Sequence, residues 1–506
     1  MEVAGFLDGL QNAVTFANLW YSLLGALLGT LVGILPGIGP TSAMAILLPV
    51  VLYLPPVAAV ILLSGIYYGA MYGGSTTAIL MNVPGEVSST VTAIDGFAMT
   101  KRGRAGEALA IAAMGSFLAG IVGVAAIAVL GPSIANVALS FGPPEYFALV
   151  VLSLTALVSF SGESLLKGSI AAVLGAWLAT VGVDPLTGIQ RLNFGSVVLM
   201  KGLDIIPVLV GLFGIAEVLV TCEASSAALF TGKLGSWISM LPRGVQLARG
   251  MAASVRGTVI GFVLGLLPGM LPALTAFLAY DVERRISRNP SEFGNGAIEG
   301  VAGPEAANNA TAMAGFVPLI SLGIPTSPAL AIMLGALMIN GLTPGPKLFT
   351  EQALFTWTVI ASMVIANGML LVLNLPLVGL WARITLVPYR ILGPIVLAFC
   401  VVGAFAARNS LFDVAVAIFF GLFGYTMRKL HWPLAPLILG LLLGPMLEQS
   451  MRQALSMSGG AVSIFVSRPI SLGLLVAALV VLLLVAFYKQ RSAVAARLIE
   501  QSSAEV

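Results

Sequence analysis

The stretch that decides the fold is GNGAIEGVAGPEAANNATAMAGFVPLISLGIPTSPALAIMLGALMINGLTPGP, residues 294–346. It is too apolar for a soluble loop, yet Gly, Pro, Asn, Thr and Ser interrupt it too often for a plain lipid-facing helix. A membrane tolerates such a broken helix only where protein or a water-filled cavity satisfies the freed backbone groups. The stretch therefore predicts an interrupted intramembrane helix and marks a candidate binding site.

The composition around this stretch is typical of a polytopic membrane protein. Of the 506 residues, 58% are hydrophobic and only 9% are charged, and the mean hydropathy is +1.03. Several runs reach the roughly 20 apolar residues that a membrane-spanning helix needs, namely 57–81, 108–130, 353–375 and 472–488. We therefore expect an all-α polytopic membrane protein.

Charge, cysteine and histidine usage exclude several other classes. The net charge of +3 is small and spread over short loops, so we expect no nucleic acid partner. Cys222 and Cys400 do not form a disulfide framework, and His431 alone cannot build a typical metal site. Glu2 and Asp8, with no basic residue before the first apolar run, argue against a cleaved signal peptide.

Ordered motif pairs indicate an internal duplication. Five pairs of segments correspond in the same order along the chain: 33–37 with 265–269, 74–77 with 308–311, 83–85 with 324–326, 163–167 with 409–413, and 207–217 with 436–448. They predict two homologous transmembrane halves. The expected organisation is an amphipathic lead at 1–17, a first repeat at 18–222, a connector at 223–249, a second repeat at 250–449, and a C-terminal loop, transmembrane helix and tail at 450–506.

The charges of the short loops indicate how the two halves are oriented. The basic cluster at 101–104 has only Lys347 at the corresponding place in the second half, and the cluster at 284–288 corresponds to an uncharged turn near Pro55. Because basic loops tend to face the cytoplasm, we expect inverted halves, an external N-terminus and a cytoplasmic C-terminus. Inverted repeats with matched Pro and Gly breaks are typical of secondary transporters, whose binding site lies near the membrane midplane.

Small polar residues gather near the breaks of both halves. Helix N-termini and side-chain hydroxyl and amide groups there can bind carboxylate oxygens with little formal charge. The predicted substrate-binding residues are Ser75, Thr76, Thr77, Ser88, Ser89, Asn308, Asn309, Thr311, Thr326 and Ser327. The alternative is that these small residues only allow helices to pack closely.

A second group of residues is predicted to bind a coupling cation. Unwound carbonyls at Gly37 and Gly269, in the two matched Pro-Gly motifs, can coordinate an ion. Glu305 is the candidate carboxylate, because an ionisable group inside a membrane is a functional candidate by default. Its alternative role is to cap the helix that carries Asn308. Glu86, Asp95 and Glu299 also lie beside the breaks.

At these residues the chain resembles a known family, the large membrane subunit of the tripartite tricarboxylate transporters. The resemblance spans roughly 20–450 and rests on LPGIGP at 35–40, GGS at 73–75, NVPGE at 82–86, DG at 95–96, PEAANNA at 304–310, LGIP at 322–325 and GLTPGP at 341–346. The chain departs from the family pattern at Thr326, where Gly is expected, and at 270–272, where smaller residues are usual. These departures leave the identity of the substrate open.

The resemblance implies an importer of di- or tricarboxylates in the bacterial inner membrane. It implies two protein partners, a small membrane subunit and a periplasmic solute-binding protein, and symport with Na⁺ or H⁺ without another cofactor. The absence of a GxxxxGK[ST] phosphate loop agrees with a gradient-driven carrier. The alternatives are a stand-alone carrier of organic anions, a channel, or an intramembrane enzyme, which one histidine and two cysteines disfavour.

Overall fold

The computed structural model describes residues 2–35, 39–160, 164–184, 186–223, 237–384 and 389–504. Helices dominate these residues, and the strands assigned within them form one antiparallel hairpin of β1 (Gly182–Val183) and β2 (Gln190–Arg191). Nine helices in this part of the chain are long and apolar enough to cross a membrane. The prediction of an all-α polytopic membrane protein is confirmed.

The chain divides into two compact units. Unit 1 consists of Met1–Leu139 and Asp204–Thr426, and unit 2 of Ser140–Leu203 and Met427–Val506. Each of the two predicted halves, 18–222 and 250–449, therefore contributes segments to both units. The boundaries of the halves and their inverted duplication stay predictions.

In unit 1, α2 (Phe16–Ile34) packs along α4 (Pro56–Met81), which is buried over nearly its whole length. The backbones come close because glycines face each other across the interface. A Cβ added at Gly29 would collide with the carbonyl of Ile66, and one at Gly33 would collide with Ala70. Small residues allow this close approach of membrane helices.

A similar close pair lies in the second half of the sequence. Helix α12 (Gly244–Gly265) packs along α14 (Glu299–Ala314). A Cβ at Gly257 would meet the carbonyl of Gly303, and one at Gly261 would meet that of Ala307. Thus α14, like α4, is held deep in unit 1, and both helices carry predicted site residues.

The stretch 294–346 is interrupted, as predicted. Helix α14 ends at Ala314 and is followed, after Gly315, by α15 (Phe316–Leu322). Helix α15 ends at Gly323, whose φ of +74° is readily adopted only by glycine. After Ile324-Pro325-Thr326, the chain re-enters a helix as α16 (Pro328–Ile339). The corresponding break in the first half follows α4, from Asn82 to η1 (Val87–Ser89) and α5 (Thr90–Lys101).

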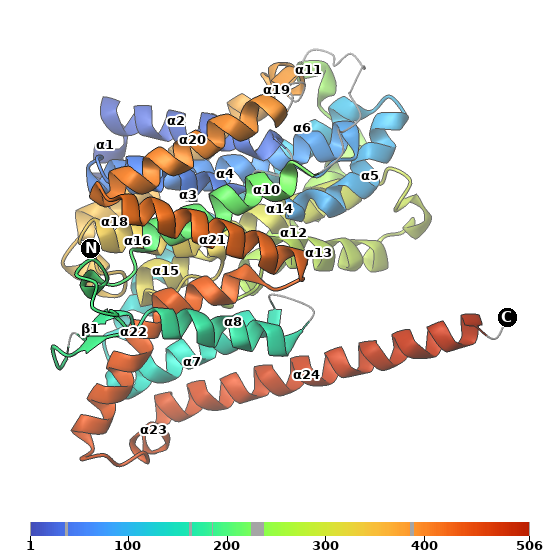
Figure 1. The fold of residues 1–506 in the computed structure, drawn as a ribbon. Helices are drawn as coiled ribbons and strands as arrows, with labels where there is room; N and C mark the ends of the chain where they lie inside the picture. Colours follow the sequence, from blue (N-terminus) through green and yellow to red (C-terminus); the bar gives the residue numbers. More distant parts are fainter. Residues whose placement is uncertain are drawn as a thin grey trace. The chain divides into compact units, whose positions relative to one another are not determined.

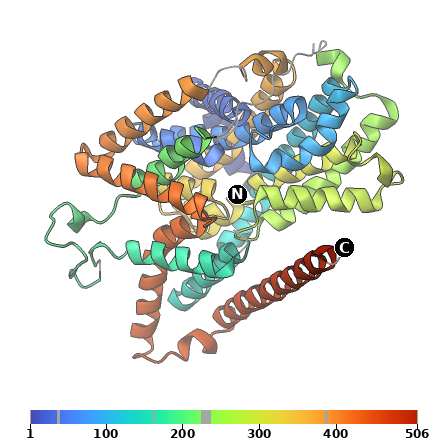
Figure 2. The same cartoon turned by 45° about the vertical axis from the view of Figure 1, so that its right-hand side comes forward.

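The light-blue α5 and α6 (Ala105–Ala138) and the yellow-green α12 and α13 (Pro272–Ile286) lie at the same end of unit 1 (Figures 1 and 2). The other elements of this unit are α1 (Glu2–Ala13), α3 (Pro40–Val51), α9 (Ile205–Leu209), the π-helical η3 (Val210–Ile215), α10 (Ala216–Thr221), α11 (Trp237–Met240), η4 (Pro290–Glu292), α17 (Lys347–Thr350), α18 (Ala353–Asn374), α19 (Val378–Ile384) and α20 (Tyr389–Arg408). Helix α21 (Leu411–Lys429) leads from unit 1 into unit 2.

Unit 2 contains α7 (Pro143–Phe160), α8 (Leu165–Leu178), the hairpin, η2 (Leu199–Lys201), α22 (Leu434–Met457), α23 (Ile464–Ser467) and α24 (Pro469–Ala504). Asp184 in the hairpin accepts from Thr187 and lies in an ion-pair network with Arg191, Arg452 and Glu448. The hydrogen bond from Thr187, together with those from the two arginines, holds the pKa of Asp184 well below its usual range.

Candidate functional site

The carboxyl group of Glu305 is the centre of a polar cluster inside unit 1. Its side chain is 0% exposed. The hydroxyl of Ser75 on α4 donates to Oε2 at 2.6 Å, and the hydroxyl of Thr92 on α5 donates to Oε1 at 2.5 Å. Three helices from distant parts of the sequence therefore meet at one carboxyl group.

The Glu305 cluster continues along the same face of α14. Asn309 lies one helical turn after Glu305, and its Nδ2 donates to Ser116 on α6 at 2.8 Å and to the carbonyl of Glu305 at 3.1 Å. Its amide is thus held by protein groups. Neighbouring Asn308 differs: it is fully buried, and neither atom of its amide has a hydrogen-bond partner among the described residues.

A small polar cavity lies beside Ser75. Its wall consists of three apolar residues and five polar ones: Leu109, Ala112, Ala113, Tyr72, Ser75, Thr76, Ser116 and Asn374. The hydroxyl of Tyr72 donates to Oδ1 of Asn367, but Oδ1 of Asn374 is buried without a partner among the described residues. A cavity with such groups suits water or a small polar ligand.

The first break places its predicted residues close to α4. The hydroxyl of Ser88 donates to the partly buried Glu86 at 2.6 Å, and Thr77 donates within α4 to the carbonyl of Gly74. The hydroxyl of Ser89 is buried and has no partner among the described residues, and it faces Gly74. Gly37 lies outside the described residues.

The second break is joined to the Pro-Gly loop between α12 and α13. The N–H of Gly269 donates to the carbonyl of Thr326 at 3.1 Å, so two unwound segments meet there. Ser327 caps α16, because its hydroxyl accepts from the N–H of Leu330. Thr311 instead lies in the α12–α14 interface, where its hydroxyl bonds to Thr275 and to the carbonyl of Gly261.

Asp95 connects α5 to the start of α14. Its Oδ1 accepts from the N–H groups of Gly296 and Ala297 at 2.6 and 2.9 Å, and its Oδ2 accepts from Tyr280 at 2.8 Å. Asp95 and Thr92 lie three residues apart and therefore on one face of α5. The carboxylate of Asp95 thus fixes the position of α14 relative to the helix that donates to Glu305.

Two of the other buried carboxylates in this region, those of Glu299 and Glu283, have cationic partners. Glu299 pairs with Arg249 at 2.6 Å, and Glu283 forms two hydrogen bonds with Arg256 at 2.8 and 2.6 Å. An ion pair with several hydrogen bonds allows a carboxylate to remain charged when buried. Glu305 has no such ion pair among the described residues, where the donors to its carboxyl group are the hydroxyls of Ser75 and Thr92.

Two sequence-based interpretations need correction. Glu305 does not cap its helix, because α14 begins at Glu299 and the Glu305 carboxyl group bonds to Ser75 and Thr92. Asn308 and Asn309 lie within α14 and not at the interruption, which follows Leu322. Pro304 is accommodated inside the helix, so the proline did not mark a helix start.

Sequence reasoning missed four polar residues of this cluster: Tyr72, Thr92, Ser116 and Asn374. Thr92 and Tyr72 lay near recognised motifs, three residues before Asp95 and one before Gly73. Ser116 and Asn374 lie in the long apolar helices α6 and α18, outside the recognised motifs, and a polar residue in a mostly apolar run was the available signal.

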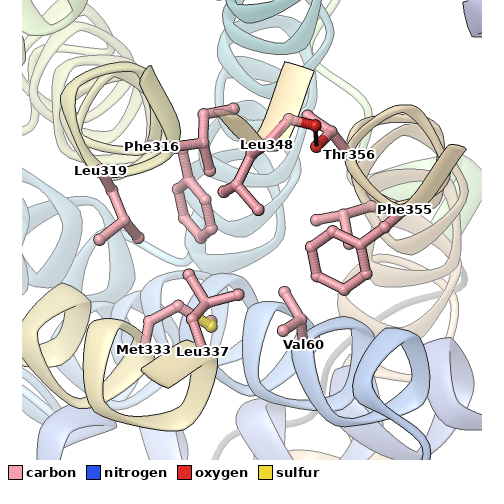
Figure 3. Close-up of a pocket in the computed structure, with 10 residues that line it drawn as sticks. Val60, Phe316, Leu319, Met333, Leu337, Leu348, Phe355 and Thr356 are labelled. Carbon is pink, nitrogen blue, oxygen red and sulfur yellow. Dashed lines mark hydrogen bonds between the residues drawn. The ribbon is translucent and has the colours of Figure 1, made fainter. Parts of the chain in front are cut away.

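A second pocket of unit 1 is almost entirely apolar (Figure 3). Phe316, Leu348, Phe355 and Met333 face its interior, and the hydroxyl of Thr356 turns away to donate to the carbonyl of Leu348 at 2.7 Å. This lining offers no group that would bind a carboxylate. The polar cluster around Glu305 is the better candidate site.

Comparison with known proteins matches this chain to a recognised sequence family. Residues 19–439 match the family described as "Tripartite tricarboxylate transporter TctA family". An uncharacterized 52.8 kDa protein in the TAR-I ttuC' 3' region of Agrobacterium vitis is 45% identical over 469 residues, covering 92% of this chain and 93% of that protein. An uncharacterized protein in the TAR-II ttuC' 3' region of the same organism is 46% identical over 211 residues, covering 42% of this chain and 87% of that protein. No solved structure matches the chain.

Proposed function

Because this chain belongs to the Tripartite tricarboxylate transporter TctA family, we propose that it is the large membrane subunit of an importer of di- or tricarboxylates, dependent on a binding protein and driven by an ion gradient. The proposal rests on the family match, because the matched residues 19–439 include both interrupted stretches and the whole Glu305 cluster. The multi-pass helical fold agrees with a role as a transporter subunit.

Asn308 is the proposed primary ligand for a substrate carboxylate. A fully buried amide without a partner is costly unless a ligand or water satisfies it, and an amide N–H can donate to a carboxylate oxygen. The hydroxyl of Ser89, which is likewise buried without a partner among the described residues, is proposed as a further donor. Thr76, which lines the polar cavity, completes this set.

The other predicted substrate-binding residues already have hydrogen-bond partners within the protein, and we propose that they support the site without contacting the substrate. Ser75 and Asn309 bond within the Glu305 cluster, Ser88 bonds to Glu86, and Ser327 caps α16. In this proposal they position the binding residues. Thr77 and Thr326 bond to backbone groups beside the two breaks, and Thr311 bonds to Gly261 across the α12–α14 interface.

The coupling ion is proposed to act in the same region. Glu305 supplies a buried carboxyl group, and the junction of Gly269 with Thr326 supplies unwound backbone of the kind that coordinates cations in secondary transporters. Gly37 is the proposed equivalent of Gly269 in the first half. Na⁺ and H⁺ are the two coupling ions to test.

The proposal includes two protein partners in a bacterial inner membrane. A periplasmic solute-binding protein would deliver the carboxylate, and a small membrane subunit would complete the translocation unit within the lipid bilayer. The N-terminus would be external and the C-terminus cytoplasmic. A stand-alone carrier would need neither partner, so the requirement for them is the decisive property.

The test is uptake of radiolabelled citrate, as the tricarboxylate probe, by liposomes that contain this chain and the small subunit. The binding protein is added or left out, and a Na⁺ gradient, a pH gradient or internal and external ATP is supplied in turn. We expect uptake only with the binding protein and an ion gradient. Uptake driven by ATP alone, or full activity without the binding protein, would contradict the proposal.

A further inference from the structure

Glu305 lies in an environment that favours a neutral carboxyl group. It is 0% exposed, and hydroxyl donors from Ser75 and Thr92 contact its two oxygens. Burying an unpaired carboxylate is costly, and two neutral hydroxyls compensate for only part of that cost. A group in such a place gains from binding a cation or a proton.

The elements packed against α14 do not bring a cation to Glu305. The two arginines of α12 are bound elsewhere, Arg249 to Glu299 and Glu292, and Arg256 to Glu283. In the part of the chain that the structure describes, no ion pair involves Glu305. The acidic and tyrosine side chains on the neighbouring elements include Tyr72 on α4, Glu86 before η1, Asp95 on α5, and Tyr280 and Glu283 on α13. The basic residues of these elements are Lys101 at the end of α5, Arg104 before α6, and Arg284 and Arg285 at the end of α13. Arg104 pairs with Glu107 and Arg285 with Asp281, and among the described residues none of the four pairs with Glu305, so the surroundings favour a proton on Glu305.

Ser75 can satisfy both protonation states of Glu305. Its hydroxyl oxygen lies 2.6 Å from Oε2 of Glu305 and 3.5 Å from the carbonyl oxygen of Met71, one helical turn earlier. When Glu305 is ionised, Ser75 donates to it. When Glu305 carries a proton on Oε2, Ser75 accepts from it and turns its own hydrogen toward Met71, as helical serines commonly do.

Ser75 also connects Glu305 to the polar cavity. The cavity wall includes Ser75, Ser116 and Asn374, and Oδ1 of Asn374 has no partner in the described chain. Water in this cavity would bond to Asn374 and reach Ser75. Thr92, which contacts the other oxygen of Glu305, does not line the cavity. Of the two hydroxyls that contact Glu305, that of Ser75 therefore lies at the cavity wall and that of Thr92 does not.

We propose that Glu305 is a proton-binding site, loaded and emptied through Ser75 from the polar cavity, and that this proton is the coupling ion. Loading moves the Ser75 hydroxyl proton to Oε2 while Ser75 takes a proton from a hydronium ion in the cavity, which leaves neutral water, and unloading reverses both transfers. Only the coupling role rests on the proposed transport function. Protonation and the route to it are measurable without any substrate.

A metal cation would use the same carboxyl group differently. To bind Na⁺, both hydroxyls would have to turn their oxygens toward the ion and release their hydrogen bonds to Glu305. Glu305 would then be ionised whenever the metal was bound. Proton binding and metal binding therefore predict opposite protonation states in the presence of the ion.

The first test uses infrared spectroscopy of the full chain in lipid vesicles at neutral pH. The C=O stretch of a protonated carboxyl group is separate from carboxylate bands, so the band can be assigned by its loss in Glu305→Gln. We expect that loss, and no change when Na⁺ replaces K⁺. Glu299→Gln is the matched control on the same helix, since Glu299 is paired with Arg249 and contributes no such band.

The second test follows hydrogen–deuterium exchange of the assigned band. Ser75→Ala should slow the exchange by about tenfold or more, because a hydrogen-bonded relay to water is lost. Thr92→Ala removes an equivalent hydrogen bond without touching the cavity and should leave the rate within about twofold. Lack of a protonated band from Glu305, its loss on adding Na⁺, or equal effects of the two variants would overturn the inference. Absence of citrate uptake in a chain that passes both tests would instead count against the proposed transport function.

Discussion

The hydroxyl of Ser75 on α4 donates to the carboxyl group of Glu305 on α14 across a separation of 230 positions in the sequence. Both residues lie in helices packed against a neighbour through facing glycines, α4 on α2 and α14 on α12. The polar clusters of the two interrupted stretches are therefore in direct contact. This contact makes the region around Glu305 a single candidate site and not two independent ones.

The first prediction concerns membrane orientation. Single cysteines at Lys101 and Arg285 should be reached by an impermeant thiol reagent only from the cytoplasmic side, and a cysteine at Lys347 only from outside, because basic loops favour the cytoplasm. The Arg285 and Lys347 side chains are 75% and 64% exposed, so the reagent has access. The background is Cys222→Ser, Cys400→Ala. Labelling of position 101 from outside in intact cells would contradict the proposed orientation.

The interruption of the stretch 294–346 could be predicted from sequence because its signals are local. Gly323 at positive φ, Pro325 and the cap at Ser327 each act within a few residues. The position of Asn308 within a continuous helix could not be predicted in this way, because a proline such as Pro304 usually signals a helix start or a break. Here close packing of α14 on α12 accommodates the proline inside the helix.

The partners of Glu305 were harder to predict. Thr92 and Ser116 contact α14 from α5 and α6, and these contacts depend on how helices far apart in the sequence pack. The division into units 1 and 2 is equally non-local, since each unit combines segments from both predicted halves. Hydrophobic periodicity specifies which faces are buried but not which distant helix covers them.

The second prediction tests Asp95 as the residue that positions α14. Asp95→Ala removes acceptors for Gly296, Ala297 and Tyr280, and hydrogen bonds to a charged group contribute about 1.5–3 kcal/mol each. We expect a clear fall in the melting temperature of the purified protein. Tyr280→Phe removes only one of the three bonds and should lower it less. Equal melting temperatures for wild type and Asp95→Ala would rule out this role.

The third prediction concerns the ion pair of Arg256 and Glu283. Glu283 is 1% exposed, whereas the Arg256 side chain is 41% exposed. Arg256→Met leaves a buried carboxylate unpaired and should cost near the lower end of about 3–5 kcal/mol. Combining it with Glu283→Leu should restore part of the stability. Thermal unfolding of both single variants and the double variant measures the coupling, and additive losses would show that the pair is not coupled.

The fourth prediction is a pH dependence of stability from Asp184 in unit 2. Hydrogen bonds from Thr187 and two arginines lower its folded-state pKa below the unfolded value of about 4. Its stabilisation is therefore fully present above pH about 4 and is lost as pH falls through the folded-state pKa. Asp184→Asn should melt earlier than wild type at pH 7, with a difference that shrinks below pH about 4. A difference that does not change with pH would argue against this ionisation.

The last prediction concerns Asn308, whose amide is buried and has no partner among the described residues. Asp has nearly the same shape, but it cannot donate and repels an anionic ligand when ionised. Asn308→Asp should weaken the apparent affinity for citrate by about ten- to a hundredfold, the equivalent of one lost hydrogen bond to a charged group, and at least as much as Asn308→Ala.

Two other asparagines act as controls for Asn308. Asn309→Asp and Asn367→Asp also change uptake, but through folding, since Asn309 donates to Ser116 and Asn367 donates to the carbonyl of Phe117. They should lower the amount of folded protein and leave the apparent affinity of that folded protein for citrate unchanged, whereas Asn308→Asp should weaken the affinity of the protein that does fold. The measurement is initial citrate uptake against concentration, normalised to folded protein in the membrane. Unchanged affinity and rate in Asn308→Asp would mean that this asparagine does not contact the substrate, because no protein partner compensates for the altered amide.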